Sequence, residues 1–351
     1  MVNLLLVSPR SENSQGGMTV WTEAFLDYCS ENNVKCDLLN IATIGSRAKQ
    51  GNSKRNFKDE YVRTKAIFGN LKQMLRSAKY DVAHLNTSCG SFGLIRDYLI
   101  ARKIKKEQPK CKCIVHFHCD LEKKTQVRYK AYFLGKILKI ADEVLVLNKG
   151  NERYLHEAYG FSAVAVPNFI NEKFVASQEK QIASHIKRAV FVGYVQPQKG
   201  AAEIYELARN FPEITFELIG EVRKDVQEWE KPDNVVLKGP MPHREIAVAL
   251  DEADVFVFPT YSEGFSIALL ESMSRGLPCI TTKVGANEEM LEGKGGVVVP
   301  VGDTISMVNA LKAMQDPAVR KEMSAWNIEK VRTQYTVQNV MKKIVESYVN
   351  K

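Results

Sequence analysis

The sequence predicts an α/β protein built from two doubly wound domains, each with its own parallel sheet. Three observations lead to this prediction. The 351-residue chain is long enough for two domains of ordinary size. Short apolar runs alternate with helix-length amphipathic segments from end to end, a pattern typical of parallel sheets with right-handed crossovers. Each half of the chain also contains enough apolar runs to form a separate sheet.

The apolar runs predict eleven strands in order along the chain. The first half contains NLLLVS (3–8), KCDLLNI (35–41), DVAHLN (81–86), KCIVHFH (112–118) and EVLVLN (143–148). The second half contains AVFVGY (189–194), TFELIG (215–220), VVLKG (235–239), DVFVFP (254–259), PCITT (278–282) and GVVVP (296–300). Most of the intervening segments have the length of a helix, so we expect a helix to connect each strand to the next.

The segment 166–187 predicts the domain boundary, because proline and asparagine give way there to a polar linker. We therefore expect a first domain over 1–167 and a second domain over 168–335. The final segment, 336–351, is amphipathic and has no strand after it, so it either closes the second domain or crosses back onto the first. Ligands of open α/β sheets bind at the carboxyl ends of the strands. We expect those ends of the two sheets to face each other across a cleft.

The composition is that of a globular protein, with 45% hydrophobic and 26% charged residues. The first apolar run is too short for a signal peptide, and no run approaches the roughly 20 residues of a spanning helix. The seven cysteines are odd in number and irregularly spaced, which suits free thiols in a reducing compartment. We therefore expect a cytoplasmic protein, either soluble or bound peripherally to the inner face of the membrane.

The positive charge is concentrated in the first half of the chain. Residues 1–168 contain 27 Lys and Arg against 16 Asp and Glu, whereas residues 169–351 contain 22 against 25. Two segments, 102–112 and 123–142, are especially rich in Lys and Arg, and the second reads as a helix whose apolar residues mostly pack on the sheet. The basic half predicts an anionic partner, such as a phosphate-bearing ligand, a membrane surface or nucleic acid. A solvated basic surface explains the same charges, and both interpretations stay open.

Two motifs favour plain structural interpretations. In CKCIVHFHC (111–119), a strand places Cys111 and Cys113 on one face and His116 and His118 on the other. One tetrahedral metal ion could not easily reach all four, so we expect a buried strand that runs into a polar loop. The run DEAD at 251–254 resembles a helicase motif, but the chain has no phosphate-binding G-x-x-x-x-G-K-[ST] loop.

Several polar or glycine positions follow predicted strands, where a ligand would bind. Gly16 and Gly17 follow the first strand and precede a helix beginning near Thr19. Their bare backbone amides suit a phosphate, although a tight turn would use the glycines equally well. Lys199 follows the strand at 189–194 and can reach an anion above the sheet. Asn86 and His118 end two other predicted strands, at the same edge as the glycine loop.

The stretch PTYSEGFSIALLESMSRGLPCITT (259–282) places two acids in apolar surroundings. Ser266 predicts the N-cap of a helix, so Glu263 precedes that helix and Glu271 lies in its second turn. The backbone amides at the helix start form an anion site with a favourable dipole. A carboxylate on each side of a bound phosphate can accept hydrogen bonds from hydroxyls. This order of hydroxyl, diphosphate and hydroxyl is the outline of a nucleotide sugar.

The segment SEGFSIALLESMSRGLPCITTKVGANEEM (262–290) resembles the signature of the retaining GT-B glycosyltransferases of family 4, the glycosyl transferases group 1. That signature has two glutamates separated by seven residues, then Gly-x-Pro, then a glycine-rich segment ending in glutamate. The matching positions are Glu263, Glu271, Gly276, Pro278, Gly285 and Glu289. Weaker likenesses occur at Gly16–Gly17, at His118, at VPN (166–168), at FVG…KG (191–200) and at KGPM (238–241).

The resemblance implies a GT-B fold and transfer of a sugar from a UDP- or GDP-linked donor to an acceptor hydroxyl, with retention of anomeric configuration. It implies no cofactor and no metal, a glycan or lipid-linked acceptor, and a place in polysaccharide or glycolipid assembly. It implies catalytic roles for His118 and Glu263. It further implies donor binding by Gly16, Gly17, Lys199, Met241, Gly264, Phe265, Ser266, Ile267 and Glu271. Glu263 would contact the donor sugar and Glu271 the ribose.

The chain departs from the family pattern at Tyr194, where an arginine usually follows FVG. Arg223 or Arg244 could supply the missing charge. Two other functions stay open beside the transferase. A sugar-nucleotide epimerase of the same fold would act on the donor without an acceptor. A non-catalytic polyanion binder would use the basic half but would leave Glu263 and Glu271 unexplained, so we do not expect nucleic acid as a partner.

Overall fold

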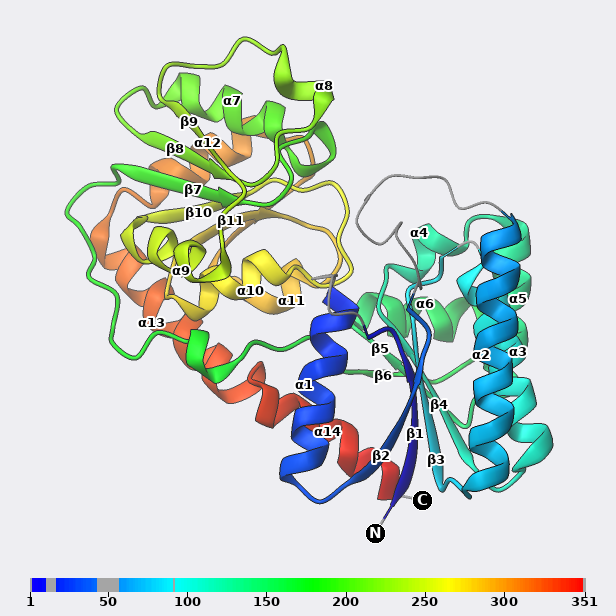
Figure 1. Cartoon of the computed structure of the whole chain (residues 1–351). Helices are drawn as coiled ribbons and strands as arrows, with labels where there is room; N and C mark the ends of the chain where they lie inside the picture. Colours follow the sequence, from blue (N-terminus) through cyan, green and yellow to red (C-terminus); the bar gives the residue numbers. More distant parts are fainter. Residues whose placement is uncertain (1, 11–16, 43–56, 91, 350–351) are drawn as a thin grey trace. The chain divides into compact units, whose positions relative to one another are not determined.

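The computed structural model describes residues 2–10, 17–42, 57–90 and 92–349. The chain divides into two compact units, Met1–Pro167 with Val340–Lys351, and Asn168–Asn339, which we call the first and second domains (Figure 1). Each contains a six-stranded parallel sheet with helices on both faces. The predicted α/β class with two doubly wound sheets is therefore confirmed.

The sheet of the first domain has the order β2-β1-β3-β4-β5-β6, with every pair parallel. Its strands are β1 (Asn3–Ser8), β2 (Lys35–Asn40), β3 (Val82–Thr87), β4 (Lys112–Phe117), β5 (Glu143–Val146) and β6 (Val164–Ala165). The strand order reverses between β1 and β3, so the carboxyl ends of these two strands flank the position where open sheets bind ligands.

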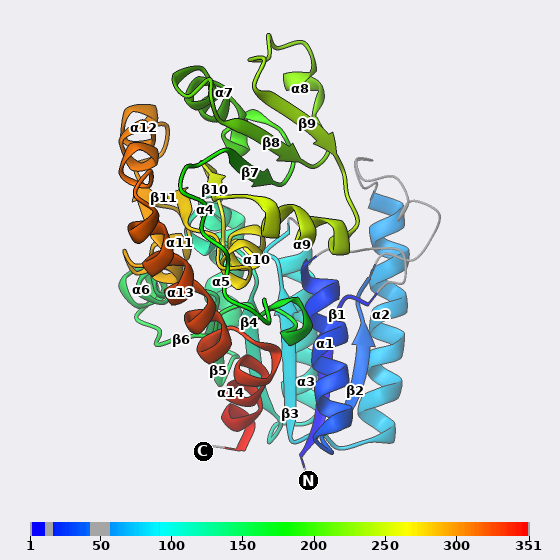
Figure 2. The same ribbon diagram turned by 90° about the vertical axis from the view of Figure 1, so that its left-hand side faces the viewer.

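Helices cover both faces of this sheet (Figures 1 and 2). Its helices are α1 (Gly17–Glu31), α2 (Phe57–Ser77), α3 (Gly93–Glu107), α4 (Leu121–Thr125), α5 (Arg128–Leu138) and α6 (Lys149–Tyr159). The chain ends in α14 (Val337–Val349), which lies beside α1, while α2, α3 and α5 cover the opposite face. The contact between Phe25 of α1 and Tyr348 of α14, at 6.4 Å between ring centroids, joins the chain's last helix to its first.

The sheet of the second domain has the order β12-β11-β10-β7-β8-β9, again all parallel. Its strands are β7 (Arg188–Val192), β8 (Thr215–Ile219), β9 (Val235–Gly239), β10 (Val255–Phe258), β11 (Cys279–Thr282) and β12 (Gly296–Val299). The order reverses between β10 and β7. The loops after these two strands therefore lie at the ligand-binding position of the sheet.

The second domain's helices include two short 3-10 turns. The 3-10 turns are η2 (Glu172–Phe174) and η3 (Pro197–Lys199). The α-helices are α7 (Ala201–Asn210), α8 (Lys224–Gln227), α9 (His243–Glu252), α10 (Ile267–Ser274), α11 (Asn287–Leu291), α12 (Thr304–Ala313) and α13 (Pro317–Gln334). The inner strands of both sheets are almost wholly buried, which is why they appear in the sequence as continuous apolar runs, whereas the edge strands β2, β6 and β9 are partly exposed.

The structure differs from the predicted elements in two places. β6 was not predicted, because two residues, one of them the exposed Val164, give no apolar run. The basic segment 123–142 is not one helix: α4 ends before Gln126, and α5 begins after Val127, whose backbone is extended. In the described part of the chain, no helix is both long and apolar enough to cross a bilayer.

Candidate active-site groups

Lys199 and Glu263 form an ion pair at the carboxyl edge of the second sheet. Lys199 ends η3, which follows β7, and Glu263 lies in the loop that follows the neighbouring strand β10. The hydroxyl of Thr260 donates to the same Glu263 oxygen at 3.3 Å. The two charged side chains are only 22% and 16% exposed, so each depends on its partner for neutralisation. The structure thus brings together two of the residues predicted to bind the donor.

Two glycines allow the loops around Glu263 to approach closely. Gly200 has a φ of +82°, and a Cβ there would lie 2.3 Å from the carbonyl oxygen of Pro259. Gly285 has a φ of +53°, and its Cβ would lie 2.4 Å from the carbonyl oxygen of Glu263. Any other residue would have to push these loops apart, because both contacts are with backbone. The glycines therefore hold the Lys199 and Glu263 segments against each other.

The helix α10 begins at Ile267 with Ser266 in the N-cap position, but the Ser266 side chain does not cap it. Its hydroxyl instead donates to Oδ1 of Asn287 at 2.6 Å, and the amide of Asn287 donates in turn to Thr281 and Thr282. The expectation that Ser266 caps the helix is therefore wrong in its detail. The Ser266 hydroxyl gives its proton to the buried Asn287, and its oxygen makes no capping bond with the amides of the first turn.

Glu271 lies in the second turn of α10, where it was predicted, and forms a pair that the sequence did not reveal. Its Oε1 lies 2.6 Å from Nε2 of His243, the first residue of α9. The Glu271 carboxylate is 11% exposed and the His243 imidazole 61%. Hydrogen bonding to this carboxylate raises the pKa of His243, against a smaller opposing effect of burial. The ring of Phe174 supports the imidazole, with 4.4 Å between centroids.

The second domain also contains four other residues named in the sequence analysis: Tyr194, Arg223, Arg244 and Met241. The guanidinium of Arg223 lies 4.0 Å from the centroid of the Tyr194 ring, and it bonds Glu221 at 2.7 Å. Tyr194, the position where the resemblance leads us to expect an arginine, therefore stacks on an arginine side chain instead. Arg244 is exposed on α9, and Met241 is half-buried in the loop between β9 and α9.

In the first domain, His118 follows β4 and belongs to a buried hydrogen-bond network. Its Nε2 lies 3.0 Å from Oδ1 of Asn86, and the same oxygen lies 3.2 Å from Nε2 of His84. Nδ1 of His84 lies 2.6 Å from the hydroxyl of Tyr348 on α14. Burial lowers the pKa of both His84 and His118 to about 3, so both rings are neutral at physiological pH.

The network continues from Asn86 to the first strand and the first helix. Nδ2 of Asn86 donates to Oγ of Ser8 at 2.9 Å, and Ser8 contacts the hydroxyl of Thr22 at 2.6 Å. Thr22 donates to the carbonyl of Met18 at 2.7 Å. Gly17 begins α1, and a Cβ there would meet nothing within 4 Å. Gly16 lies outside the described residues, so the predicted phosphate site of this loop stays a prediction.

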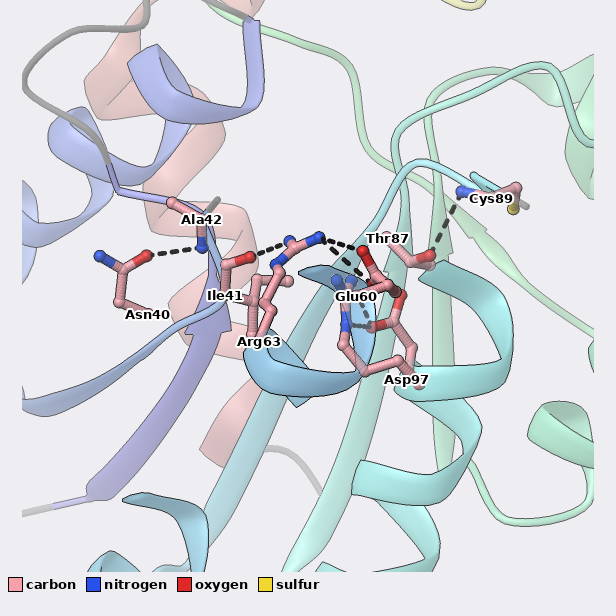
Figure 3. Close-up of polar contacts among 9 residues, drawn as sticks. Asn40, Ile41, Ala42, Glu60, Arg63, Thr87, Cys89 and Asp97 are labelled. Atoms are coloured by element: carbon pink, nitrogen blue, oxygen red, sulfur yellow. Dashed lines mark hydrogen bonds and ion pairs between the residues drawn. The ribbon is translucent and has the colours of Figure 1, made fainter. Parts of the chain in front are cut away.

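A second group of buried polar residues at this edge was not predicted. Figure 3 shows Glu60 and Arg63 of α2 near Asp97 of α3 and the ends of β2 and β3. Arg63 pairs with Glu60 at 3.2 Å and donates to the carbonyl of Ile41, and Asp97 pairs with Arg96 at 2.8 Å. Each ion pair is local to one helix, and the bond from Arg63 to Ile41 joins two residues that are 22 positions apart, which periodicity does not reveal. Deleting one partner leaves a buried charge at a cost of about 3–5 kcal/mol.

The predicted interpretation of CKCIVHFHC as a buried strand agrees with β4, since Cys111, Cys113 and His116 are all buried. Across the residues that the structure describes, no three His, Cys, Asp or Glu side chains are grouped so that they could hold a metal ion. His116 is nevertheless unusual. It lies 4.0 Å from His118 between ring centroids, and neither of its buried ring nitrogens has a hydrogen bond among the described residues.

We predict that replacing His116 and His84 by leucine will have opposite effects on stability. His116→Leu removes a polar group with no partner, so the free energy of unfolding should stay constant or rise by about 1 kcal/mol. His84→Leu removes the partner of the buried Tyr348 hydroxyl and one of the two histidines bonded to the Asn86 oxygen, and it should cost about 1–3 kcal/mol. Denaturant unfolding of the two variants measures both changes. Equal destabilisation by the two would contradict the assignment of His116.

We also predict a pH-dependent contribution of the His243–Glu271 pair to stability. Because the folded-state pKa of His243 is raised, its contribution is fully present below the ordinary pKa of 6.5 and is lost as pH rises through the raised value. The difference in unfolding free energy between the parent and His243→Gln, measured from about pH 5 to 9, should therefore shrink with pH. It should not exceed about 1 kcal/mol, because the imidazole is largely exposed. A difference that is independent of pH would show that no such ion pair forms.

Comparison with known proteins agrees with the fold and with the region around Glu263. Residues 181–316 match the family model described as Glycosyl transferases group 1. A UDP-Gal:alpha-D-GlcNAc-diphosphoundecaprenol alpha-1,3-galactosyltransferase of Escherichia coli is 25% identical over 310 residues, which are 80% of this chain and 78% of that protein.

Two solved structures superimpose over nearly the full length. Sucrose-phosphate synthase from Thermosynechococcus elongatus has a TM-score of 0.80 at 18% identity and covers 99% of this chain and 98% of its own. Anabaena Alr3699/HepE, solved with UDP and glucose, has a TM-score of 0.72 at 13% identity and covers 100% of both chains. The chain thus has the GT-B fold of two Rossmann-like domains, and residues 181–316 of its second domain match the family model of the glycosyl transferases group 1.

Proposed function

We propose that this protein transfers a sugar, with retention of anomeric configuration, from a UDP- or GDP-linked donor to a hydroxyl of a glycan or lipid-linked acceptor. The observation that carries the proposal is the Lys199–Glu263 pair beside the uncapped start of α10 and the carboxylate of Glu271. In this arrangement the diphosphate meets the amides of Gly264, Phe265, Ser266 and Ile267 and the charge of Lys199. Glu263 accepts from sugar hydroxyls and Glu271 from the ribose.

Arg223 completes the charge around the diphosphate in this proposal. Its guanidinium stacks on Tyr194, which follows β7 as Lys199 does. A stacked arginine is held in one plane and keeps its donors for oxygen ligands. Met241, after β9, would lie beside the base. This chain would thereby replace the family's arginine by a tyrosine that positions a second arginine.

For this reaction the protein must orient the donor and the acceptor and stabilise the charge that develops on the leaving group. The acceptor oxygen forms a bond to the anomeric carbon on the face from which the diphosphate departs, and the bond from that carbon to the phosphate oxygen breaks. The acceptor proton passes to the departing phosphate oxygen, so no protein base is needed. Lys199 and the helix amides stabilise the charge on the leaving group, where it develops. His118 would lie beside the transferred sugar.

The relatives support a role in glycan or glycolipid assembly and suggest which donors to test. The E. coli relative is named as a galactosyltransferase that uses UDP-Gal and a diphosphoundecaprenol-linked acceptor. A phosphatidyl-myo-inositol mannosyltransferase of Mycobacterium leprae is 28% identical over 196 residues, 51% of this chain and 52% of that protein. HepE was solved with UDP. Thermal stabilisation by a panel of UDP- and GDP-sugars would identify the donor, because a ligand of the folded state raises its stability.

We also propose that the first domain contacts an anionic membrane through the surface of α4 and α5. We define this α4–α5 surface as Lys123, Lys124, Val127, Arg128, Tyr129, Lys130 and Tyr132. Of the apolar residues in this segment, Leu134, Ile137 and Leu138 are buried, as predicted, but Val127 and Tyr132 are 50% and 59% exposed. Exposed tyrosines among basic side chains have the chemistry of a membrane–water interface.

We predict that the two glutamates have different kinetic roles. Glu263→Gln should lower kcat roughly 100-fold or more, because its contacts with the sugar support the reacting centre. Glu271→Gln should chiefly weaken nucleotide binding, by roughly 10- to 100-fold, because it contacts ribose. Steady-state kinetics and calorimetric binding of the nucleotide diphosphate measure the two effects separately.

A matched control for these variants is Glu206→Gln, which removes an exposed carboxylate on α7. It should leave both quantities at the parent values. Parent-like turnover by Glu263→Gln and Glu271→Gln would overturn the site assignment. Conversion of the donor without any acceptor would favour an epimerase, and the anomeric configuration of the product, read by NMR, tests retention.

We predict that the protein sediments with anionic liposomes but not with neutral ones, and that salt releases it. Each basic residue near an anionic surface contributes about 1 kcal/mol, and salt screens this attraction within about 8 Å. Changing Lys123, Lys124, Arg128 and Lys130 to Gln should weaken sedimentation and leave donor affinity unchanged. The control changes Arg209, Lys294, Lys312 and Lys321, exposed in the second domain, and should bind like the parent. Equal binding to both liposome types, or to neither, would leave the α4–α5 surface as solvated surface.

A further inference from the structure

The buried network in the first domain fixes the protonation of His118. We propose that Tyr348, His84 and Asn86 are positioning residues that hold His118 as the tautomer protonated at Nε2, with Nδ1 left to accept a hydrogen bond from a substrate hydroxyl. The inference rests on the proposed function only for the identity of that hydroxyl. The tautomer itself follows from the hydrogen bonds within the domain.

A backbone carbonyl determines which group donates and which accepts in each hydrogen bond of the network. The oxygen of Met18 can only accept, so the Thr22 hydroxyl, 2.7 Å away, must donate its one proton there. The contact of 2.6 Å between Thr22 and Ser8 then requires Ser8 to be the donor. With its proton used, Ser8 can only accept from the third member, Asn86, at 2.9 Å.

This requirement decides the orientation of the Asn86 amide. Asn86 must turn its NH₂ group toward Ser8, so its oxygen faces the two histidines. An amide oxygen only accepts, so His84 and His118 must each carry a proton on Nε2. The hydrogen bonds, rather than the fit of the side chain alone, therefore determine both tautomers.

The other end of the network is consistent with the same direction. A neutral His84 protonated at Nε2 has a lone pair on Nδ1, and the Tyr348 hydroxyl can donate to it at 2.6 Å. Burial raises the pKa of Tyr348 and lowers that of His84, so phenol and imidazole both stay neutral. Every hydrogen bond from Tyr348 to Met18 thus has one donor and one acceptor. A reversed Asn86 amide would place two acceptors, the Asn86 oxygen and Oγ of Ser8, against each other with no proton between them.

The free nitrogen of His118 is the functional consequence. His118 is half-buried, and the described hydrogen bonds give its Nδ1 no protein partner. Burial keeps the ring neutral, so Nδ1 offers a lone pair rather than a charge. A neutral acceptor of this kind suits a sugar or acceptor hydroxyl, since the hydroxyl is a donor and needs no counter-charge. A phosphate oxygen, which only accepts, would find no donor at this nitrogen.

The C-terminal helix takes on a role in this arrangement. Tyr348 lies on α14 and is separated from His84 by 264 residues in sequence. Its hydroxyl is the only donor that the described hydrogen bonds give to Nδ1 of His84. The return of α14 to the first domain therefore supplies a polar group to the histidine network, in addition to apolar packing against α1.

The first test is NMR of the full chain labelled with ¹⁵N-histidine, at neutral pH and without substrate. Long-range proton–nitrogen correlations distinguish a protonated from a bare ring nitrogen, and His118→Gln and His84→Gln assign the signals. We expect a protonated Nε2 and a bare Nδ1 for both rings. A proton on Nδ1 of His118, or a mixture of tautomers, would overturn the proposal.

The second test changes the start of the network, away from His118. Thr22→Val removes the acceptor for the Ser8 proton, so Ser8 can donate to Asn86 and the amide can reverse. We expect the His118 signals then to show a proton on Nδ1. Thr22→Ser keeps the hydroxyl and should restore the parent spectrum. A parent spectrum in Thr22→Val would contradict the proposed direction.

The third test asks whether the tautomer matters for transfer. Asn86→Leu and Thr22→Val should lower kcat roughly tenfold, the size of one misdirected hydrogen bond, with the donor KM nearly unchanged. Tyr348→Phe should lower kcat less, because Asn86 still directs His118. Tyr205→Phe, at a buried tyrosine of α7, is the matched control and should behave like the parent. Parent-like kcat in Asn86→Leu would overturn the positioning role. The expected spectra without any sugar transfer would instead overturn only the proposed function.

Discussion

When helices cover both faces of a parallel sheet, functional polar side chains can gather only where the strands end. Along the strands, side chains point into apolar layers, and an unpaired polar group there is costly. Both sheets of this protein obey the constraint. Lys199 and Glu263 follow adjacent strands of the second sheet, and Ser8, Asn86 and His118 lie at the ends of adjacent strands of the first. The reversal of strand order separates two crossovers at that point and leaves room for a ligand.

The second domain meets this constraint with charges held in pairs. Glu263 pairs with Lys199, and Glu271 accepts a hydrogen bond from His243, so each partly buried carboxylate has a partner within the protein. Carboxylates, an ammonium group and the amides of a helix start are also the groups that bind hydroxyls and phosphates. Close backbone approach at Gly200 and Gly285 keeps the paired segments together. The close backbone contacts position the side chains, and the charges provide affinity for a ligand.

The first domain solves the same problem with neutral groups. Three histidines lie within one buried aromatic cluster that includes Trp21, and burial keeps them uncharged. In this domain the direction of the hydrogen bonds determines how the polar groups are oriented, as charge does in the second domain. A sequence of donors and acceptors that begins at a carbonyl can be satisfied in one way only. His116 takes no part in these hydrogen bonds. Among the described residues, both of its buried ring nitrogens lack a partner, which is unfavourable.

The sequence by itself determined the fold class, eleven of the twelve strands and the positions of Glu263 and Glu271 on either side of a helix start. These features are local: a buried strand is a continuous apolar run, and a helix start has a characteristic residue. Only the tertiary structure decided that His243 pairs with Glu271, that Ser266 bonds Asn287 instead of capping, and that Tyr348 reaches His84. Those contacts join residues 28, 21 and 264 positions apart, and no periodicity encodes them. They form because packing brings the side chains together in an interior where each polar group must find a partner.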